Sequence, residues 1–164
     1  MTSGDFQPQP GQHGEPSGSP PPPGGQEPGG LALRFGARLI DGIIVGIVAS
    51  VLIFATDTLS NYWFTGLFTG LLTFLYFLGL ESTQGWTIGK KLLGLSVHGP
   101  GGAPKPTAQQ SAIRNSWTLL PIIPFVGGLL GVIAIVVIAV TINSSPTKQG
   151  KHDEIAGGTQ VVKG

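Results

Sequence analysis

The sequence predicts an all-α integral membrane protein, with about three transmembrane helices of which the third is broken by proline and glycine, and with a disordered N-terminal tail. Three observations predict this class. Only 10% of the 164 residues are charged, against about 25% in soluble domains. The charges avoid three long apolar stretches. The first thirty residues, by contrast, contain almost no apolar side chains that could form a core.

Residues 1–30 are predicted to form a disordered cytoplasmic tail. This segment holds eight prolines and eight glycines, and Phe6 is its only large apolar residue besides Met1. Such a composition cannot offset an ordering cost of about 1–2 kcal/mol per residue. The segment also lacks the apolar stretch of a secretory signal peptide.

Two membrane helices are expected next, over about 35–55 and 63–80. The first contains one charge, Asp41, and the second contains none. Both are long enough for a hydrocarbon core of about 30 Å, the first with the help of arginine side chains that extend to the interface. The residues between them suffice only for a tight turn, so the two helices are predicted to form a hairpin.

A polar loop follows over residues 81–116. The alternation of Leu93, Leu95 and Val97 predicts a short strand. A helix is expected to begin at Thr107 and to continue through Asn115.

The basic stretch in this loop resembles a phosphate-binding loop only superficially. The sequence TIGKK lacks the glycine spacing of such a loop, and no Ser or Thr follows the lysines. We therefore expect Trp86, Lys90 and Lys91 to contact lipid headgroups.

The third apolar stretch, residues 117–142, contains no charge but is interrupted by Pro121, Pro124 and a glycine pair. It predicts a broken first segment over about 117–126 and a regular helix over about 127–142. We expect a single crossing of the membrane. The alternative is a re-entrant hairpin, which would return the chain to its starting side.

The distribution of basic residues predicts the orientation. Arg34, Arg38 and the four basic residues of the polar loop lie on one side, whereas the turn over 56–62 contains Asp57 and no Lys or Arg. The positive-inside rule therefore places the N-terminus and the polar loop in the cytoplasm. With a single crossing, the C-terminal tail over 143–164 would lie outside. Its three lysines favour the inside instead, so the sequence leaves the side of the C-terminus open.

Three patches together resemble the RDD family of small bacterial integral membrane proteins. They read RFGARLIDGIIV, GWTIGKKLLGLSVHGPGGAPKP and SPTKQGKHDEIAGGTQVV. The resemblance implies an RDD-type membrane domain over residues 31–163 in a bacterial plasma membrane. The Pro-rich tail, outside this region, looks like an actinobacterial elaboration. One departure is the pair Gly157–Gly158, where the family usually has one glycine.

The family is named for one arginine and two aspartates. The resemblance maps these onto Arg38, Asp41 and Asp153, and Arg34 competes with Arg38 for the arginine position. It implies no established activity, although the family has been suspected of transport.

Asp41 is the most informative residue by its position alone. A carboxylate inside an apolar helix costs about 2.5–3.5 kcal/mol on insertion scales, which marks a candidate functional site. Arg38 lies on the same helix face. The pair is either a structural ion pair at the end of the helix or the site of an ion or proton.

The second helix carries a stripe of hydroxyl groups that includes Thr69, Thr73 and Tyr76. Tyr76 is expected at about the depth of Asp41. The stripe serves either plain helix packing, with threonines bonded to their own backbone, or a lined polar pathway.

Enzymatic chemistry is not expected. His152 beside Asp153 resembles half of a catalytic triad, but the nearby serines lack the required context. There are no cysteines, and the histidines lack the spacing of zinc ligands. We therefore expect no metal and no cofactor, and the net charge of +1 gives no reason to expect a nucleic-acid partner.

Two functions remain as hypotheses. In the first, the protein binds or transports a small cation or proton at Asp41, and it does so as a homo-oligomer because three spans enclose too little volume for a complete path. In the second, it is a non-catalytic scaffold or accessory subunit whose Pro-rich tail recruits a cytoplasmic partner. Both place the protein in a lipid bilayer.

Overall fold

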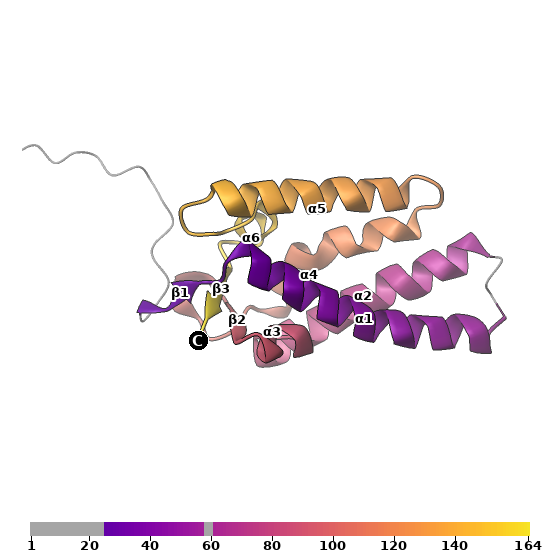
Figure 1. The fold of residues 1–164 in the computed structure, drawn as a ribbon, viewed down its shortest axis with the longest axis horizontal. Helices are drawn as coiled ribbons and strands as arrows, with labels where there is room; N and C mark the ends of the chain where they lie inside the picture. Colours follow the sequence, from indigo (N-terminus) through magenta and orange to yellow (C-terminus); the bar gives the residue numbers. More distant parts are fainter. Residues whose placement is uncertain (1–24, 58–60) are drawn as a thin grey trace, which may run out of the picture.

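The computed structural model describes residues 25–57 and 61–164. Most of the predicted tail, residues 1–24, lies outside this range. Three of the helices described are long and apolar enough to cross a membrane, and they lie side by side in Figure 1. They are α1 (Leu31–Ala55), α2 (Tyr62–Gln84) and α5 (Gly127–Ser144). The predicted number of membrane helices is therefore confirmed.

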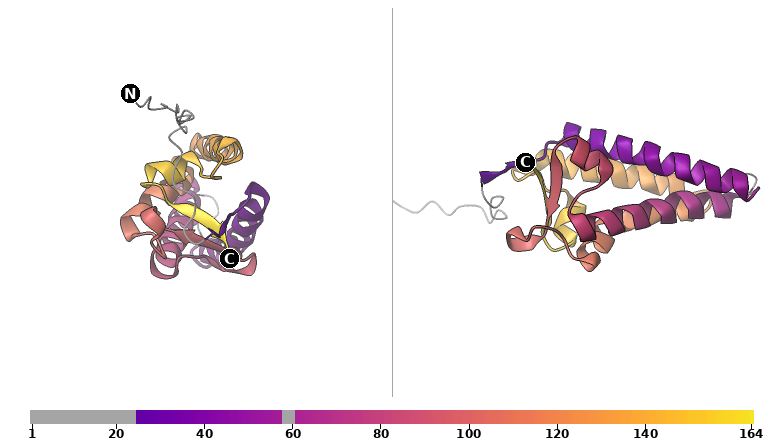
Figure 2. Two further views of the ribbon diagram at one scale, coloured as in Figure 1. Left: turned by 90° about the vertical axis from the view of Figure 1, so that its left-hand side faces the viewer. Right: turned by 90° about the horizontal axis from the view of Figure 1, so that it is seen from below.

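Shorter elements gather at one end of these helices, which we call the polar end (Figure 2). In the sequence between α2 and α5, these are α3 (Ile88–Leu92), β2 (Leu95–His98), the 3-10 turn η2 (Pro100–Gly102) and α4 (Ala108–Asn115). The 3-10 helix η3 (Ser116–Ile122) follows α4 and leads away from this end. After α5 come α6 (Lys151–Ile155) and β3 (Gln160–Lys163), and before α1 lies β1 (Glu27–Pro28).

Local sequence signals account for several of these elements. Thr107 and Gln110 form a reciprocal capping box that starts α4 where the sequence predicts it. Strand β2 likewise confirms the predicted strand. The α2 helix begins at the side chain of Asn61, which accepts a hydrogen bond from the amide of Trp63 at 3.1 Å, and it ends at Gly85 with φ of 77°.

A small antiparallel sheet joins three segments that are far apart in the sequence. Its strand order is β1-β3-β2, with Val97 opposite Val161 and Pro28 opposite Val162. The side chains of Leu95, Val97 and Val161 pack with Ala37 of α1 in a buried apolar cluster. Glu27 and Pro28 therefore belong to the folded unit, although composition alone assigns them to the tail.

The third apolar stretch folds back on itself. Its first part, η3, runs along α2, where a Cβ atom at Gly66 would lie 2.6 Å from the carbonyl oxygen of Pro121. Since Gly66 belongs to the second turn of α2, at the end away from the sheet, Pro121 has nearly reached that end. The chain turns over residues 123–126, and α5 then returns to the polar end (Figure 1).

The expected single crossing is therefore wrong, and the re-entrant alternative agrees with the structure. The physical reason lies in two features. Pro121 and Pro124 lack amide donors and disfavour a continuous helix. Pairing of β3 with β2 and β1 also holds the C-terminal tail at the end where the 81–116 loop lies.

We predict that positions 101 and 164 are accessible from the same side of the membrane and position 57 from the other. The chain has no native cysteine, so Asp57→Cys, Gly101→Cys and Gly164→Cys can be labelled singly with a membrane-impermeant maleimide in sealed vesicles. Labelling of position 164 together with position 57 would contradict the fold.

Candidate functional site

Asp153 of α6 lies at the centre of a group of buried charges at the polar end. It is fully buried, and its carboxylate oxygens lie 3.0 Å from Nη1 of Arg34 and 3.1 Å from Nε of Arg114. The amide of Gly150 and the hydroxyl of Thr159 also donate to it, each at 3.2 Å. The carboxylate thus joins the start of α1, the end of α4 and the C-terminal tail.

The turn after α6 brings Thr159 back to this carboxylate. Gly157 and Gly158 have φ values of 91° and 90°, which glycine adopts without strain. The pair Gly157–Gly158, singled out in the sequence, is therefore part of the turn that closes on Asp153.

Glu81, at the end of α2, is a second fully buried carboxylate. It forms a salt bridge with Lys90 of α3 and accepts a hydrogen bond at 2.9 Å from the side-chain amide of Asn115. Arg114 Nε lies 3.9 Å from Oε2 of Glu81, the oxygen that also accepts from Asn115. Arg114 therefore lies between the two carboxylates and connects them in one network.

Arg38 faces the same region but forms a different kind of contact. Its guanidinium lies over the ring of Phe77, 3.6 Å from the centroid, and 4.6 Å from that of Trp117. It also donates a long hydrogen bond of 3.5 Å to Asn115. Arg38 is thus held by aromatic faces and by an amide.

Asp41 is separate from this network and its partners are neutral. One oxygen accepts hydrogen bonds from the hydroxyl of Tyr76 and the amide of Gly89, both at 2.7 Å, and the other accepts from the hydroxyl of Thr87 at 2.6 Å. Gly89 lies directly against the backbone of α1, where a side chain would clash. Asp41 therefore fastens α1 to α2 and α3.

The expected pair of Arg38 and Asp41 is not formed among the described residues. Arg34, the competing arginine, forms the ion pair with Asp153. The reason is geometric, since donors from α2 and α3 fill both oxygens of Asp41, while the C-terminal tail brings Asp153 to the first turn of α1.

The threonine stripe on α2 serves its own helix. The hydroxyls of Thr69 and Thr73 donate to the carbonyl oxygens four residues earlier, at 2.8 and 2.5 Å. This arrangement agrees with the packing interpretation rather than with a polar pathway. Tyr76 is the member of the stripe that reaches across to α1.

The lysines after α2 differ in position. Lys91 is exposed and its Nζ lies 4.0 Å from the centroid of the Trp86 ring, an arrangement compatible with a headgroup contact. Lys90, in contrast, is only 6% exposed and pairs with Glu81. The prediction that Lys90 lies at the surface like Lys91 is wrong, because its salt bridge with Glu81 holds it inside the polar end.

Sequence reasoning missed Glu81, Arg114 and Asn115. A signal was present for Glu81, which directly follows an uncharged stretch of 18 residues in the second helix. Arg114 and Asn115 carry no comparable signal, because each looks like an ordinary polar residue of a loop.

Electrostatics at the polar end follow from burial and from close partners. Burial lowers the pKa of Lys90 to about 8, against the opposing effect of Glu81. Burial likewise lowers the pKa of His152 to about 4, so this side chain is neutral near pH 7. Burial would raise the pKa of Asp153, but the charges led by Arg114 outweigh it and hold this pKa well below its ordinary value.

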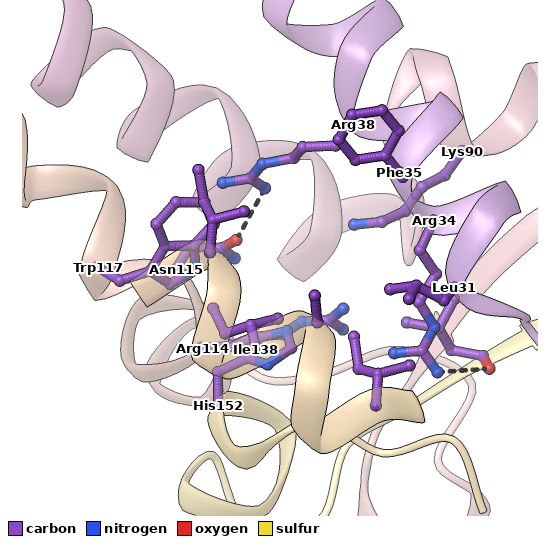
Figure 3. A pocket seen from close by; sticks show the side chains of 14 residues that line it. Leu31, Arg34, Phe35, Arg38, Lys90, Arg114, Asn115, Trp117, Ile138 and His152 are labelled. Atoms are coloured by element: carbon purple, nitrogen blue, oxygen red, sulfur yellow. Dashed lines mark hydrogen bonds between the residues drawn. The ribbon is translucent and has the colours of Figure 1, made fainter. Parts of the chain in front are cut away.

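A cavity of about 160 Å³ opens beside the network, between α1 and α5 (Figure 3). Its polar lining consists of four cationic side chains together with Asn115 and His152, and no Asp or Glu is among the described lining residues. The four cations are Arg34, Arg38, Lys90 and Arg114. Its apolar lining comes mainly from α1 and α5.

Two guanidinium nitrogens at this cavity lack a hydrogen-bond partner among the described residues. They are Nη1 of Arg114, which is only 4% exposed, and Nη2 of Arg38. In Figure 3 the guanidinium of Arg114 and the ammonium of Lys90 point toward the middle of the cavity. The lining thus offers hydrogen-bond donors and positive charge to whatever it binds.

The charges of the site do not balance. Four cations face the cavity, and their ion-pair partners are the two carboxylates Glu81 and Asp153. Even when Asp41 is counted, one positive charge remains. Such an arrangement suits an anionic group, because buried charge is costly unless it is paired.

A family model described as the RDD family matches residues 28–157. No curated protein and no solved structure matches the chain.

We predict that Asp41→Asn costs only about 1 kcal/mol of stability, whereas Asp41→Leu costs about 2–4 kcal/mol. Asn keeps an oxygen for Tyr76 and Gly89, and the hydroxyl of Thr87 can rotate to accept from its amide. Leu leaves three buried donors without an acceptor. Unfolding by SDS in mixed micelles measures both variants, and equal losses would contradict this role of Asp41.

We also predict that the free energy of unfolding decreases as the pH falls from about 6.5 toward about 4. In this range His152 takes up a proton in the unfolded chain. It does not do so in the folded chain, where burial lowers the pKa of His152 to about 4. Between about pH 7 and about pH 5 the expected loss is about 2 kcal/mol. His152→Gln should remove this part of the pH dependence, and a profile unchanged in that variant would refute the assignment.

Proposed function

The chain belongs to the RDD family, and from this premise and the charged cavity we propose that it is a multi-pass membrane protein that binds an anionic group at its cytoplasmic end. The observation that carries the proposal is the unpaired, buried Nη1 of Arg114 at a cavity lined by four cations. An anion with several oxygens satisfies such donors and offsets the excess charge together.

The chemistry of the lining supports this over a cationic ligand. A cation in the cavity would meet Arg34, Arg38, Lys90 and Arg114 and none of the described carboxylates. Asp41, the group that the sequence suggests for a cation or proton, already accepts three hydrogen bonds on its two oxygens. Since Asp41 is also fully buried, a cation would have to enter among these neutral donors.

We propose the cytoplasm as the compartment at the polar end and the bacterial plasma membrane as the location. All nine Lys and Arg residues of the sequence belong to segments at this end, whereas Asp57 lies at the other. The positive-inside rule then orients the polar end toward the cytoplasm. With α5 returning, the lysines of the C-terminal tail obey the same rule.

Transport and partner recruitment remain secondary hypotheses. The three spans enclose too little volume for a complete path, so transport requires several copies of the chain. Recruitment of a partner depends on the Pro-rich tail, whose residues 1–24 lie outside the described range. The pairing of β1 with β3 indicates only that this tail is attached at the polar end.

The test compares inorganic phosphate with chloride at matched ionic strength, using the full chain in a neutral detergent. We predict that phosphate raises the thermal unfolding midpoint in a saturable way. Arg38→Gln should weaken the apparent affinity about tenfold or more, consistent with the loss of one charged hydrogen bond. Lys91→Gln removes an exposed charge beside the cavity lysine and should leave the affinity unchanged.

A midpoint that is equal in phosphate and chloride would overturn the proposal. So would an equal loss of affinity in the two variants, because it would show attraction by net charge alone. Fluorescence of Trp117, whose ring lines the cavity beside Arg38, gives an independent readout of phosphate binding.

A further inference from the structure

The walls of the charged cavity show what kind of molecule carries the anionic group. Its charged lining lies at the polar end, but its other side is formed by apolar residues of the two membrane helices α1 and α5. These residues are Leu31, Phe35, Ile135, Ile138, Ala139 and Ile142. A fully water-soluble ligand gains nothing from such a wall.

The apolar wall reaches the outer surface of the bundle. Phe35 is 64% exposed and Ile135 is 45% exposed, and both belong to helices that are long and apolar enough to cross a membrane. Surface of this kind on a membrane helix faces acyl chains. The apolar side of the cavity is therefore continuous with the exposed apolar surface of α1 and α5.

The depth of the cations corresponds to the headgroup layer. Arg34 and Arg38 lie in the first turns of α1, directly beside the small sheet that ends the hydrophobic part of the molecule. Basic pockets between membrane helices on the cytoplasmic side are a known way of holding anionic headgroups. The volume of about 160 Å³ is smaller than the roughly 300–1,000 Å³ of pockets that enclose a whole ligand, which suits a headgroup whose chains remain outside.

We propose that the anionic group is the headgroup phosphate of an anionic phospholipid, which enters sideways from the cytoplasmic leaflet between α1 and α5. This inference rests on the proposed anion binding and specifies its ligand. The phosphate oxygens accept from Arg114 Nη1 and Arg38 Nη2, and the acyl chains lie along Phe35 and Ile135. A zwitterionic lipid is disfavoured, because its ammonium would lie among four cations.

The experiment uses the full chain, delipidated in neutral detergent and offered equal amounts of phosphatidylglycerol and phosphatidylcholine. Native mass spectrometry then counts the lipid that each protein molecule retains. We expect at least a tenfold preference for phosphatidylglycerol, and Arg38→Gln should remove most of it. Equal retention of the two lipids by the wild-type chain overturns the inference.

A second variant tests the entrance between α1 and α5. Ala139→Phe adds a ring to the apolar wall and should abolish the lipid preference. Val140→Phe is the matched control, because Val140 is adjacent, 60% exposed and outside the lining. Val140→Phe should retain the lipid preference and the stabilisation by phosphate.

The outcomes are distinguishable. If phosphate stabilises the chain but phosphatidylglycerol shows no preference, the lipid inference fails and the anion site stands. If Ala139→Phe keeps the lipid preference, entrance between α1 and α5 is wrong. If neither phosphate nor phosphatidylglycerol acts, both proposals fail. The unfolding midpoint of Ala139→Phe without ligand shows whether this variant folds. If it does not fold, the lipid preferences of the wild-type chain and of Arg38→Gln decide whether the lipid inference holds.

Discussion

A carboxylate that is completely removed from water must be met by charges and hydrogen bonds, and at Asp153 this requirement determines the arrangement of the polar end. Its partners come from α1, α4 and the turn after α6. They cannot meet unless α5 returns the chain to the side where α1 begins. The re-entrant path of the third apolar stretch and the gathering of the cations therefore depend on one another.

The sequence predicts well those elements that hydropathy and local sequence signals determine. The three membrane helices, the start of α4 and strand β2 each depend on residues within one short window, and all of them occur in the structure. The proximity of Asp41 and Tyr76 also follows from counting turns along two hairpin helices, and their side chains are bonded at 2.7 Å. Helix geometry makes such depth arguments reliable.

What the sequence does not predict is which charges become partners. Arg34 and Arg38 lie one turn apart on the same helix, so helical periodicity cannot distinguish which of them pairs with Asp153. In the structure, Arg34 forms this ion pair. That choice depends on where the C-terminal tail packs, more than a hundred residues later. Lys90 turns inward for a similar reason, since its partner Glu81 belongs to another helix. The excess of positive charge at the cavity thus arises only when the segments of the polar end pack together in the folded protein.

The central position of β3 in the sheet has a consequence for how the chain is made. In the sheet that the structure describes, β1 and β2 are not neighbours, and each pairs with β3, which is synthesised after both of them and after α5. Until β3 has left the ribosome, the earlier strands have no pairing partner, and until α6 has left it, the arginines of α1 and α4 lack Asp153. The three long apolar helices are therefore already synthesised when the polar end closes, and a chain truncated before residue 153 carries exposed strand edges and unpaired cations.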